Sequence, residues 1–297
     1  MNSLNKNQSL EFEYGQKIHY TLRIASAMCF IGHGSFGIIK KEIWSNYFGV
    51  FGIGKGLSFH LMPLLGSIDI LMGIIILVYP IRAIVAWLVV WGTITALLRP
   101  LSGEPFAEFI ERAGNFGAPL ALLILSGGVN THFRKIFTPI EPGIQPDMRK
   151  LEWVITCLRF VVFFLFVGHG WLNVIAKKSL LDQYRILGFA DPAKTAQFIG
   201  IFEIIAGFAV LIRPIRSFVL ILFIWKVTSE LFYPHYELFE WIERGGSYGS
   251  ILALWFALSA VSSVTKKGER AKPVKYLFNY HQQRTNYFLS SYKVYTK

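Results

Sequence analysis

Long apolar runs are the feature that most limits how this chain of 297 residues can fold. Hydrophobic residues make up 53% of the sequence and charged residues only 16%, whereas a soluble domain carries about 25% charged residues. A run of roughly 20 apolar residues crosses a bilayer, and it must be helical because lipid offers the backbone no hydrogen-bond partner. The expected fold class is therefore an all-α, polytopic membrane protein. We identify eight runs, at about 20–39, 59–79, 81–98, 115–131, 153–176, 196–212, 215–233 and 247–264.

One pattern occurs twice in the same order, at residues 22–126 and 158–259. The repeat acts as an alignment of two members, because it shows which polar residues both copies kept. The matched residues are Leu22-Arg23 and Leu158-Arg159; Gly32-His33-Gly34 and Gly168-His169-Gly170; Lys40-Lys41 and Lys177-Lys178; Asp69, Gly73, Pro80, Arg82 and Glu203, Gly207, Pro214, Arg216; and Glu111-Arg112 and Glu243-Arg244.

Each copy supplies four of the eight apolar runs. Because four is an even number, both copies enter the membrane from the same side, which predicts two parallel four-helix repeats related by an axis along the membrane normal. The expected divisions are a cytoplasmic N-terminal segment at 1–18, a first repeat at 19–131, a cytoplasmic linker at 132–152, a second repeat at 153–264, and a basic, aromatic cytoplasmic tail at 265–297.

Most lysine and arginine residues lie on the side that holds both chain ends. The positive-inside rule therefore predicts cytoplasmic termini in a multi-pass protein of the inner (cytoplasmic) membrane of the cell. The net charge of +12 is explained by these flanks and by anionic lipid head groups, so no nucleic-acid partner is expected. The tail is interpreted as a solvated topogenic segment, with docking to the membrane surface or to a partner as the alternative.

Ionisable residues recur at matching depths within the runs. His33 lies eight residues before Lys41, which places it about 12 Å from the outer end of its helix at 1.5 Å per residue. Asp69 lies ten residues beyond Phe59, about 15 Å from the outer end of the next helix, so the two side chains are expected to meet. In the second copy, His169 lies eight residues before Lys177, and Glu203 lies eight residues after Thr195.

Two interpretations of these residues stay open. An ionisable residue within a span is costly, which marks a candidate site for a ligand or for proton transfer. A histidine–carboxylate pair can equally lock two helices together, and a Glu-Arg pair can fix a loop to a helix end. The candidate ligand-binding residues are His33, Asp69, Arg99, Glu111, Arg112, His169, Glu203, Lys226, Glu230, Glu243 and Arg244, and no catalytic residue is identified.

The copies also differ within this set. Arg99 matches Tyr233, whereas Lys226 and Glu230 match Gly92 and Ala96. Lys226 and Glu230 are four residues apart, which predicts an ion pair along one helix. The difference indicates that the candidate sites of the two copies bind different molecules or that one of them has lost its function.

Other cofactors are less favoured. His33 and His169 are the only candidates at matching depth for the two axial ligands of a b-type haem. A retinal Schiff base on Lys226 conflicts with the repeat and with eight spans. The sequence holds too few suitable ligands for zinc, so no metal site is expected.

The repeat resembles the DoxX-like integral membrane proteins, here as a tandem duplication of their four-helix unit. The resemblance rests on Gly32-His33-Gly34 with Lys40, on Gly168-His169-Gly170 with Lys177, and on a glycine–carboxylate–glycine pattern in the second helix. That pattern comprises Gly200, Glu203, Gly207 and Arg213-Pro214 in the second copy, and Gly66, Asp69 and Gly73 in the first.

The resemblance implies a four-helix bundle around an internal pocket. It favours a membrane subunit that binds a quinone-like or other lipophilic molecule, in some relatives within a membrane oxidoreductase assembly. The alternatives are a non-enzymatic scaffold or assembly factor, and a small transporter or proton path. Whether the chain is itself an enzyme stays open. The expected partners are membrane lipid and other membrane or redox-complex subunits.

Overall fold

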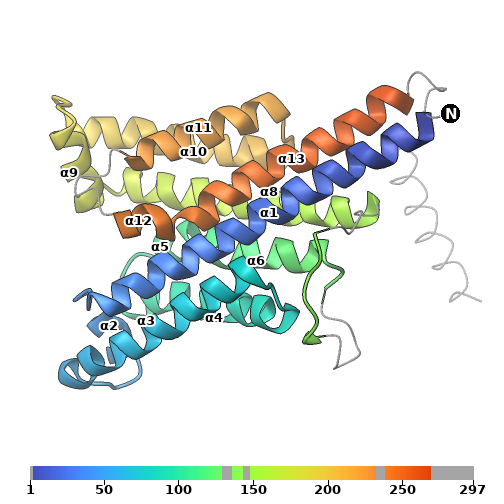
Figure 1. Cartoon of the computed structure of the whole chain (residues 1–297). Coiled ribbons are helices and arrows are strands. Elements are labelled where there is room, and N and C mark those ends of the chain that lie inside the picture. The colour runs from blue at the N-terminus through green and yellow to red at the C-terminus, as the bar shows by residue number, and fades with distance from the viewer. Residues whose placement is uncertain (1–2, 129–135, 143–147, 232–237, 269–297) are drawn as a thin grey trace, which may run out of the picture. The chain divides into compact units, whose positions relative to one another are not determined.

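The computed structural model describes residues 3–128, 136–142, 148–231 and 238–268. The regular secondary structure of these residues is α-helical, which confirms the all-α prediction (Figure 1). The helices are α1 (Ser3–Ile38), α2 (Trp44–Gly49), α3 (Lys55–Val78), α4 (Arg82–Leu101), α5 (Ala107–Glu111), α6 (Ala113–Leu125), α8 (Met148–Val174), α9 (Lys178–Ile186), α10 (Pro192–Ile212), α11 (Arg216–Leu231), α12 (Leu238–Glu243) and α13 (Gly245–Gly268).

Residues Met1–Leu258 form one compact unit, and Ser259–Lys297 form a second. All contacts discussed below lie in the first unit. Tyr233, parts of the expected linker and the tail from residue 269 lie outside the described residues.

Five helices are long and apolar enough to cross a membrane: α3, α4, α8, α10 and the combined segment Leu238–Ser262. Three of the eight expected spans are not among these five, each for a physical reason. Helix α6 has 13 residues and α11 has 16, fewer than the roughly 20 that span a bilayer. Helix α1 has 36 residues, but Arg23, His33 and its many small residues make it less apolar.

The first helix also begins earlier than expected. The polar residues before position 19 were assigned from the sequence to a separate N-terminal segment at 1–18. In the structure, α1 includes them back to Ser3. An ion pair between Glu13 and Lys17, 2.6 Å apart and one turn from each other, supports this extension.

Glycines bring the first two long helices of each copy, α1 with α3 and α8 with α10, into backbone contact. A Cβ atom at Gly34 of α1 would lie 2.4 Å from the carbonyl oxygen of Gly66 in α3. A Cβ atom at Gly170 of α8 would lie 2.6 Å from the carbonyl oxygen of Gly200 in α10. Small residues at helix crossings permit such approach in membrane proteins. The crossing places each histidine beside the carboxylate of the neighbouring helix.

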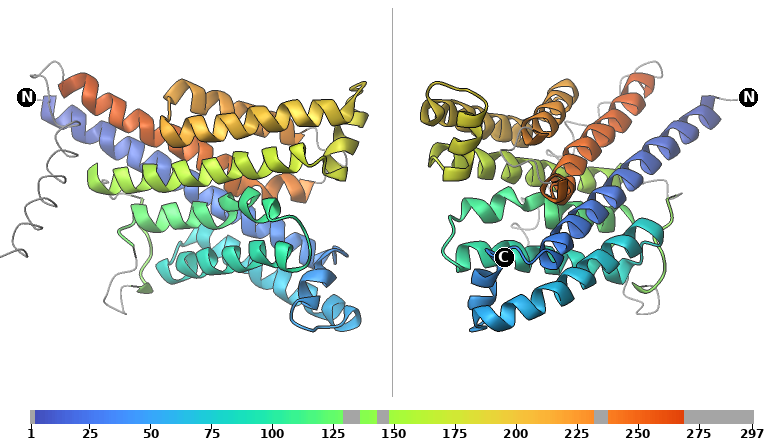
Figure 2. Two further views of the ribbon diagram at one scale, coloured as in Figure 1. Left: turned by 180° about the vertical axis from the view of Figure 1, so that it is seen from behind. Right: turned by 60° about the vertical axis from the view of Figure 1, so that its left-hand side comes forward.

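The short helix before the last helix of one copy packs on the first helix of the other copy. Helix α12 lies against α1, and α5 lies against α8 (Figures 1 and 2). Glycine again allows the approach: a Cβ atom at Gly32 would lie 2.2 Å from the backbone nitrogen of Glu243, and one at Gly168 would lie 2.3 Å from that of Glu111. The two copies therefore exchange these segments.

The lysine pairing expected from the sequence is wrong by one residue. Lys40 and Ala176 are the matching positions, because each ends its helix with a φ of 56°. The next residues, Lys41 and Lys177, therefore correspond. The left-handed residue stands seven positions after the histidine in both copies, so the register of the histidines holds to the helix ends and the two Lys-Lys pairs are offset by one residue.

We predict that replacing Gly66 or Gly200 by alanine destabilises the protein by about 1–3 kcal/mol, because the added methyl group meets backbone that must move. Thermal unfolding in mild detergent measures the effect. Gly56 in the first turn of α3 has open space around its Cβ position, so Gly56→Ala is the matched control and should leave the melting temperature unchanged or slightly raised. Equal melting temperatures for all three variants would contradict the close crossing.

Candidate functional site

The first copy contains a cavity of about 290 Å³ between α2, α3 and α4. Its polar end holds His33 and Asp69, whose Nδ1 and Oδ2 atoms are 2.8 Å apart. The indole nitrogen of Trp91 donates to the other oxygen of Asp69 at 2.8 Å. Trp44 covers the histidine, with ring centroids 4.6 Å apart. The contact between His33 and Asp69 confirms the sequence prediction.

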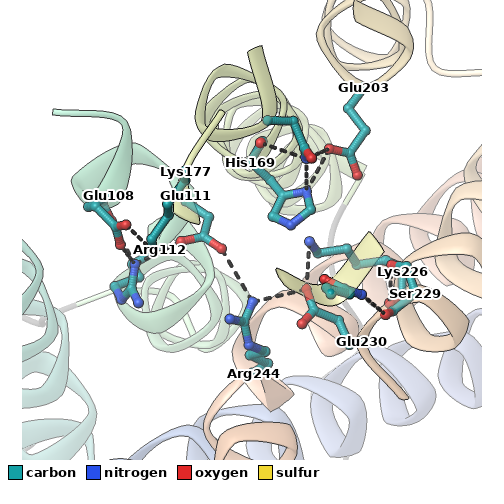
Figure 3. Close-up of polar contacts among 12 residues, drawn as sticks. Glu108, Glu111, Arg112, His169, Lys177, Glu203, Lys226, Ser229, Glu230 and Arg244 are labelled. Carbon is teal, nitrogen blue, oxygen red and sulfur yellow. Dashed lines mark hydrogen bonds and ion pairs between the residues drawn. The ribbon is translucent and has the colours of Figure 1, made fainter. Parts of the chain in front are cut away.

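The second copy contains a corresponding cavity of about 230 Å³. The Nδ1 atom of His169 lies 2.6 Å from Oε2 of Glu203, which confirms the second predicted contact (Figure 3). Trp225 donates from its indole nitrogen to Glu203 at 3.3 Å. Asn173 adds a donor to the same carboxylate at 3.4 Å and accepts a hydrogen bond from the Tyr184 hydroxyl at 2.7 Å.

Both tryptophans were missed in the sequence analysis, which considered mainly ionisable residues. The repeat itself contained the signal, because Trp91 and Trp225 have the same separation of 134 as the two carboxylates they contact. Each copy thus builds one triad, defined here as the histidine, the carboxylate and the tryptophan.

An ionic chain connects the regions beside the two cavities (Figure 3). Glu108 is fully buried and pairs with Arg112 at 2.6 Å, and Arg112 also pairs with Glu111 at 2.7 Å. Arg244 continues the chain, lying 3.2 Å from Glu111 and 2.9 Å from Glu230. The chain is the set Glu108, Arg112, Glu111, Arg244, Glu230 and Lys226.

Two further ion pairs cross between the copies in a reciprocal manner. Lys41 lies 2.5 Å from Glu240 of α12, and Lys177 pairs with Glu108 of α5. Glu108 and Glu240 are 132 residues apart, the same separation as the two Glu-Arg pairs. Each lysine after a first helix therefore neutralises a glutamate of the other copy. These glutamates were not among the candidate residues.

The arginines determine the charge state of the buried carboxyls. Burial alone would raise the pKa of Glu111, but Arg112, Arg244, His169 and Lys177 outweigh it and hold that pKa well below its ordinary value. The pKa of Glu108 is lowered in the same way: Arg112, Lys177 and Arg99 together outweigh burial and the repulsion from Glu111. Both side chains are therefore anions at neutral pH.

The candidate residues thus form three groups. Arg99, Arg112 and Glu243 line the first cavity together with His33 and Asp69. Glu230 lines the second cavity with His169 and Glu203. Glu111, Lys226 and Arg244 lie along the ionic chain, and the predicted pair of Lys226 with Glu230 is confirmed at 2.7 Å. Within the part of the chain that the structure describes, no three His, Cys, Asp or Glu side chains are placed to hold a metal ion.

We predict that Glu111→Gln lowers stability at pH 7 by about 1–3 kcal/mol, because Arg112 and Arg244 each lose one buried partner and keep another. Since the folded pKa of Glu111 is depressed, its contribution is present above the unfolded value of about 4.3 and is lost as pH falls through the folded pKa. The difference in melting temperature between wild type and variant should shrink on acidification. Glu42→Gln is the control, because Glu42 pairs with Lys55 at an exposed position. A difference independent of pH would contradict the ionic chain.

Comparison of the chain with protein-family models, with curated proteins and with solved structures finds no match in any of the three. The resemblance to the DoxX-like proteins therefore stays a prediction.

Proposed function

We propose that the chain is an integral membrane protein of two parallel four-helix repeats, each of which binds a small lipophilic molecule with an uncharged polar head, such as a quinone. The observation that supports this function best is the triad, which occurs twice at the polar end of a largely apolar cavity. An apolar pocket with a few convergent polar groups is typical of small-molecule sites.

The triad suits a ligand that carries a carbonyl or hydroxyl group. The Asp69 carboxylate accepts from Nδ1–H of His33, so the second ring nitrogen, Nε2, faces the ligand: it accepts from a hydroxyl when the ring is neutral and donates to a carbonyl when the ring is protonated. Trp91 holds the second oxygen of Asp69 and so fixes the carboxylate. The pair could also accept a proton from the ligand and return it. The second triad provides the same functions with His169, Glu203 and Trp225.

The charges around the first cavity favour a neutral head group. Its two guanidinium groups already have carboxylate partners: Arg99 lies 3.1 Å from Glu104 and 3.4 Å from Glu108, and Arg112 pairs with Glu108 and Glu111. An anionic ligand would have to compete with these buried pairs. A neutral head group needs only a hydrogen bond with Nε2 of the histidine, and the apolar walls accept its hydrophobic portion.

A non-enzymatic scaffold is the second candidate function. The reciprocal pairs of Lys41 with Glu240 and of Lys177 with Glu108 support it, because they fix one copy against the other without any ligand. In that function each triad would hold neighbouring helices together, and the chain would recruit membrane or redox-complex subunits.

The proposed topology has eight spans in the inner membrane, with α1, α6 and α11 joining the five apolar helices and both termini in the cytoplasm. We predict that protease-sensitive tags at the two ends show the same accessibility in membrane vesicles of known orientation. Opposite accessibility of the two tags would refute the parallel arrangement.

Conservative changes of the triad carboxylates separate ligand binding from packing. Asp69→Asn and Glu203→Gln keep the side-chain shape but remove a charge that orients the histidine. If the triads bind a ligand, each variant should retain at least tenfold less co-purified lipophile while its melting temperature changes little. Absorption spectra and mass spectra of protein purified in mild detergent measure the retention.

Asp182→Asn serves as the control, because Asp182 pairs with Arg185 on an exposed part of α9. Loss of about 1–3 kcal/mol of stability in both triad variants, with no lipophile retained even by the wild type, would refute the binding proposal and favour the scaffold.

A further inference from the structure

The two triad cavities differ at one matched position of their walls. Ala96 of α4 lines the first cavity, and Glu230, 134 residues later in α11, lines the second. The triad tryptophans Trp91 and Trp225, which lie on the same two helices, line the two cavities in the same register. The second copy therefore presents a carboxylate to its cavity where the first copy presents a methyl group.

Two cations contact the same oxygen of Glu230 and keep the side chain ionised. Oε1 lies 2.7 Å from Nζ of Lys226 and 2.9 Å from Nη1 of Arg244. Among the described residues, none donates a hydrogen bond to the second oxygen, Oε2. Each oxygen of a carboxylate can accept hydrogen bonds, so Oε2 remains available to a donor in the cavity.

The second cavity offers a ligand a charged acceptor but no charged donor. Among the described residues, no lysine or arginine lines it, and Lys226 is only 1% exposed. The indole of Trp225, the hydroxyl of Tyr184 and the amide of Gln183 each donate to a protein acceptor. The wall therefore suits a ligand that brings its own donor.

The first cavity has the opposite character. Arg99 and Arg112 both line it, and both use Nη1 for the contacts with their carboxylate partners. A guanidinium group carries five N–H donors, so each arginine retains donors that a neutral carbonyl oxygen can accept while the ion pairs stay intact. The first wall therefore suits a ligand that brings an acceptor.

We propose that Glu230 makes the second cavity selective for the hydroxyl form of a lipophilic ligand, such as a hydroquinone, whereas the first cavity takes the carbonyl form, such as a quinone. This inference rests on the proposed function of the triads, because it assigns a ligand class to each of the same two sites. A ligand hydroxyl in the second cavity donates to Oε2 of Glu230. Nε2 of His169, which lines the same cavity, is a second acceptor while the ring is neutral.

The test compares decylhydroquinone with decylbenzoquinone, which share a ring and a tail and differ in hydroxyl against carbonyl groups. The full-length protein carries Asp69→Asn, which disables the first triad and leaves the second cavity to bind. Isothermal titration calorimetry in mild detergent, under anaerobic conditions that keep the hydroquinone reduced, measures both Kd values. The hydroquinone should bind about tenfold more tightly, as expected for one hydrogen bond to a charged acceptor.

Adding Lys226→Met and Glu230→Ala to that protein should abolish the preference. The two changes remove the buried ion pair as a unit, which proteins often tolerate, and Arg244 keeps Glu111 as its partner. The alanine also reproduces the residue of the first copy. The preference of the Asp69→Asn protein tests the inference even if this variant fails to fold.

The matched control is the Glu203→Gln protein, in which the second triad is disabled and the first cavity remains. It should prefer the quinone, and adding Lys226→Met and Glu230→Ala should leave that preference unchanged. Equal affinity for both ligands in the Asp69→Asn protein, or an unchanged preference after Glu230 is removed from it, would overturn the assignment while the proposed function stands. Binding of neither ligand by the wild type would refute the proposed function and the assignment with it.

Discussion

The structure depends on the neutralisation of charges that lie away from water. Glu108 is fully buried and Glu111 is 5% exposed, and a carboxylate in such surroundings is stable only with close cationic partners. Arg112 and Arg99 supply such partners within the same copy, and the other copy of the repeat supplies Lys177 for Glu108 and Arg244 for Glu111. The association of the copies is thus a condition for burying these residues, and the close glycine contacts of α5 on α8 and of α12 on α1 follow from it.

The two copies differ in the chemistry of their polar side chains but make the same backbone contacts. The triads differ by one methylene group, Asp69 against Glu203, and the second triad gains Asn173 and Tyr184. The second copy also carries Lys226 and Glu230 within α11, which extend its ionic chain. A repeat whose architecture is retained while its polar lining changes is well suited to holding two different molecules in equivalent places.

The sequence predicted the two histidine–carboxylate contacts and the Lys226–Glu230 pair, because these contacts depend on depth along neighbouring helices or on spacing within one helix. It did not predict the pairs of Lys41 with Glu240 and of Lys177 with Glu108, since the exchange of segments between copies leaves no periodic signal. The lysine register was misjudged because the two Lys-Lys pairs match by residue type, whereas the left-handed residues Lys40 and Ala176 show that the pairs are offset by one position. Helix α6 is shorter than its apolar run suggested, because hydropathy does not show that Gly127 and Gly128, both at positive φ, follow the end of the helix.

The exchange of segments also has a consequence for how such a chain could exist without its duplication. A single unit of this kind would lack the partner that the other copy gives to the lysine after its first helix and to the glutamate before its last. A second identical unit, related by a twofold axis, would satisfy both at once, because such an interface is self-complementary. In the proposed two-repeat arrangement, the tandem chain corresponds to a homodimer whose subunits are covalently joined. The two subunits of a homodimer have the same sequence. When both halves belong to one chain, each half can change separately, so residues such as Lys226 and Glu230 can occur in one half only.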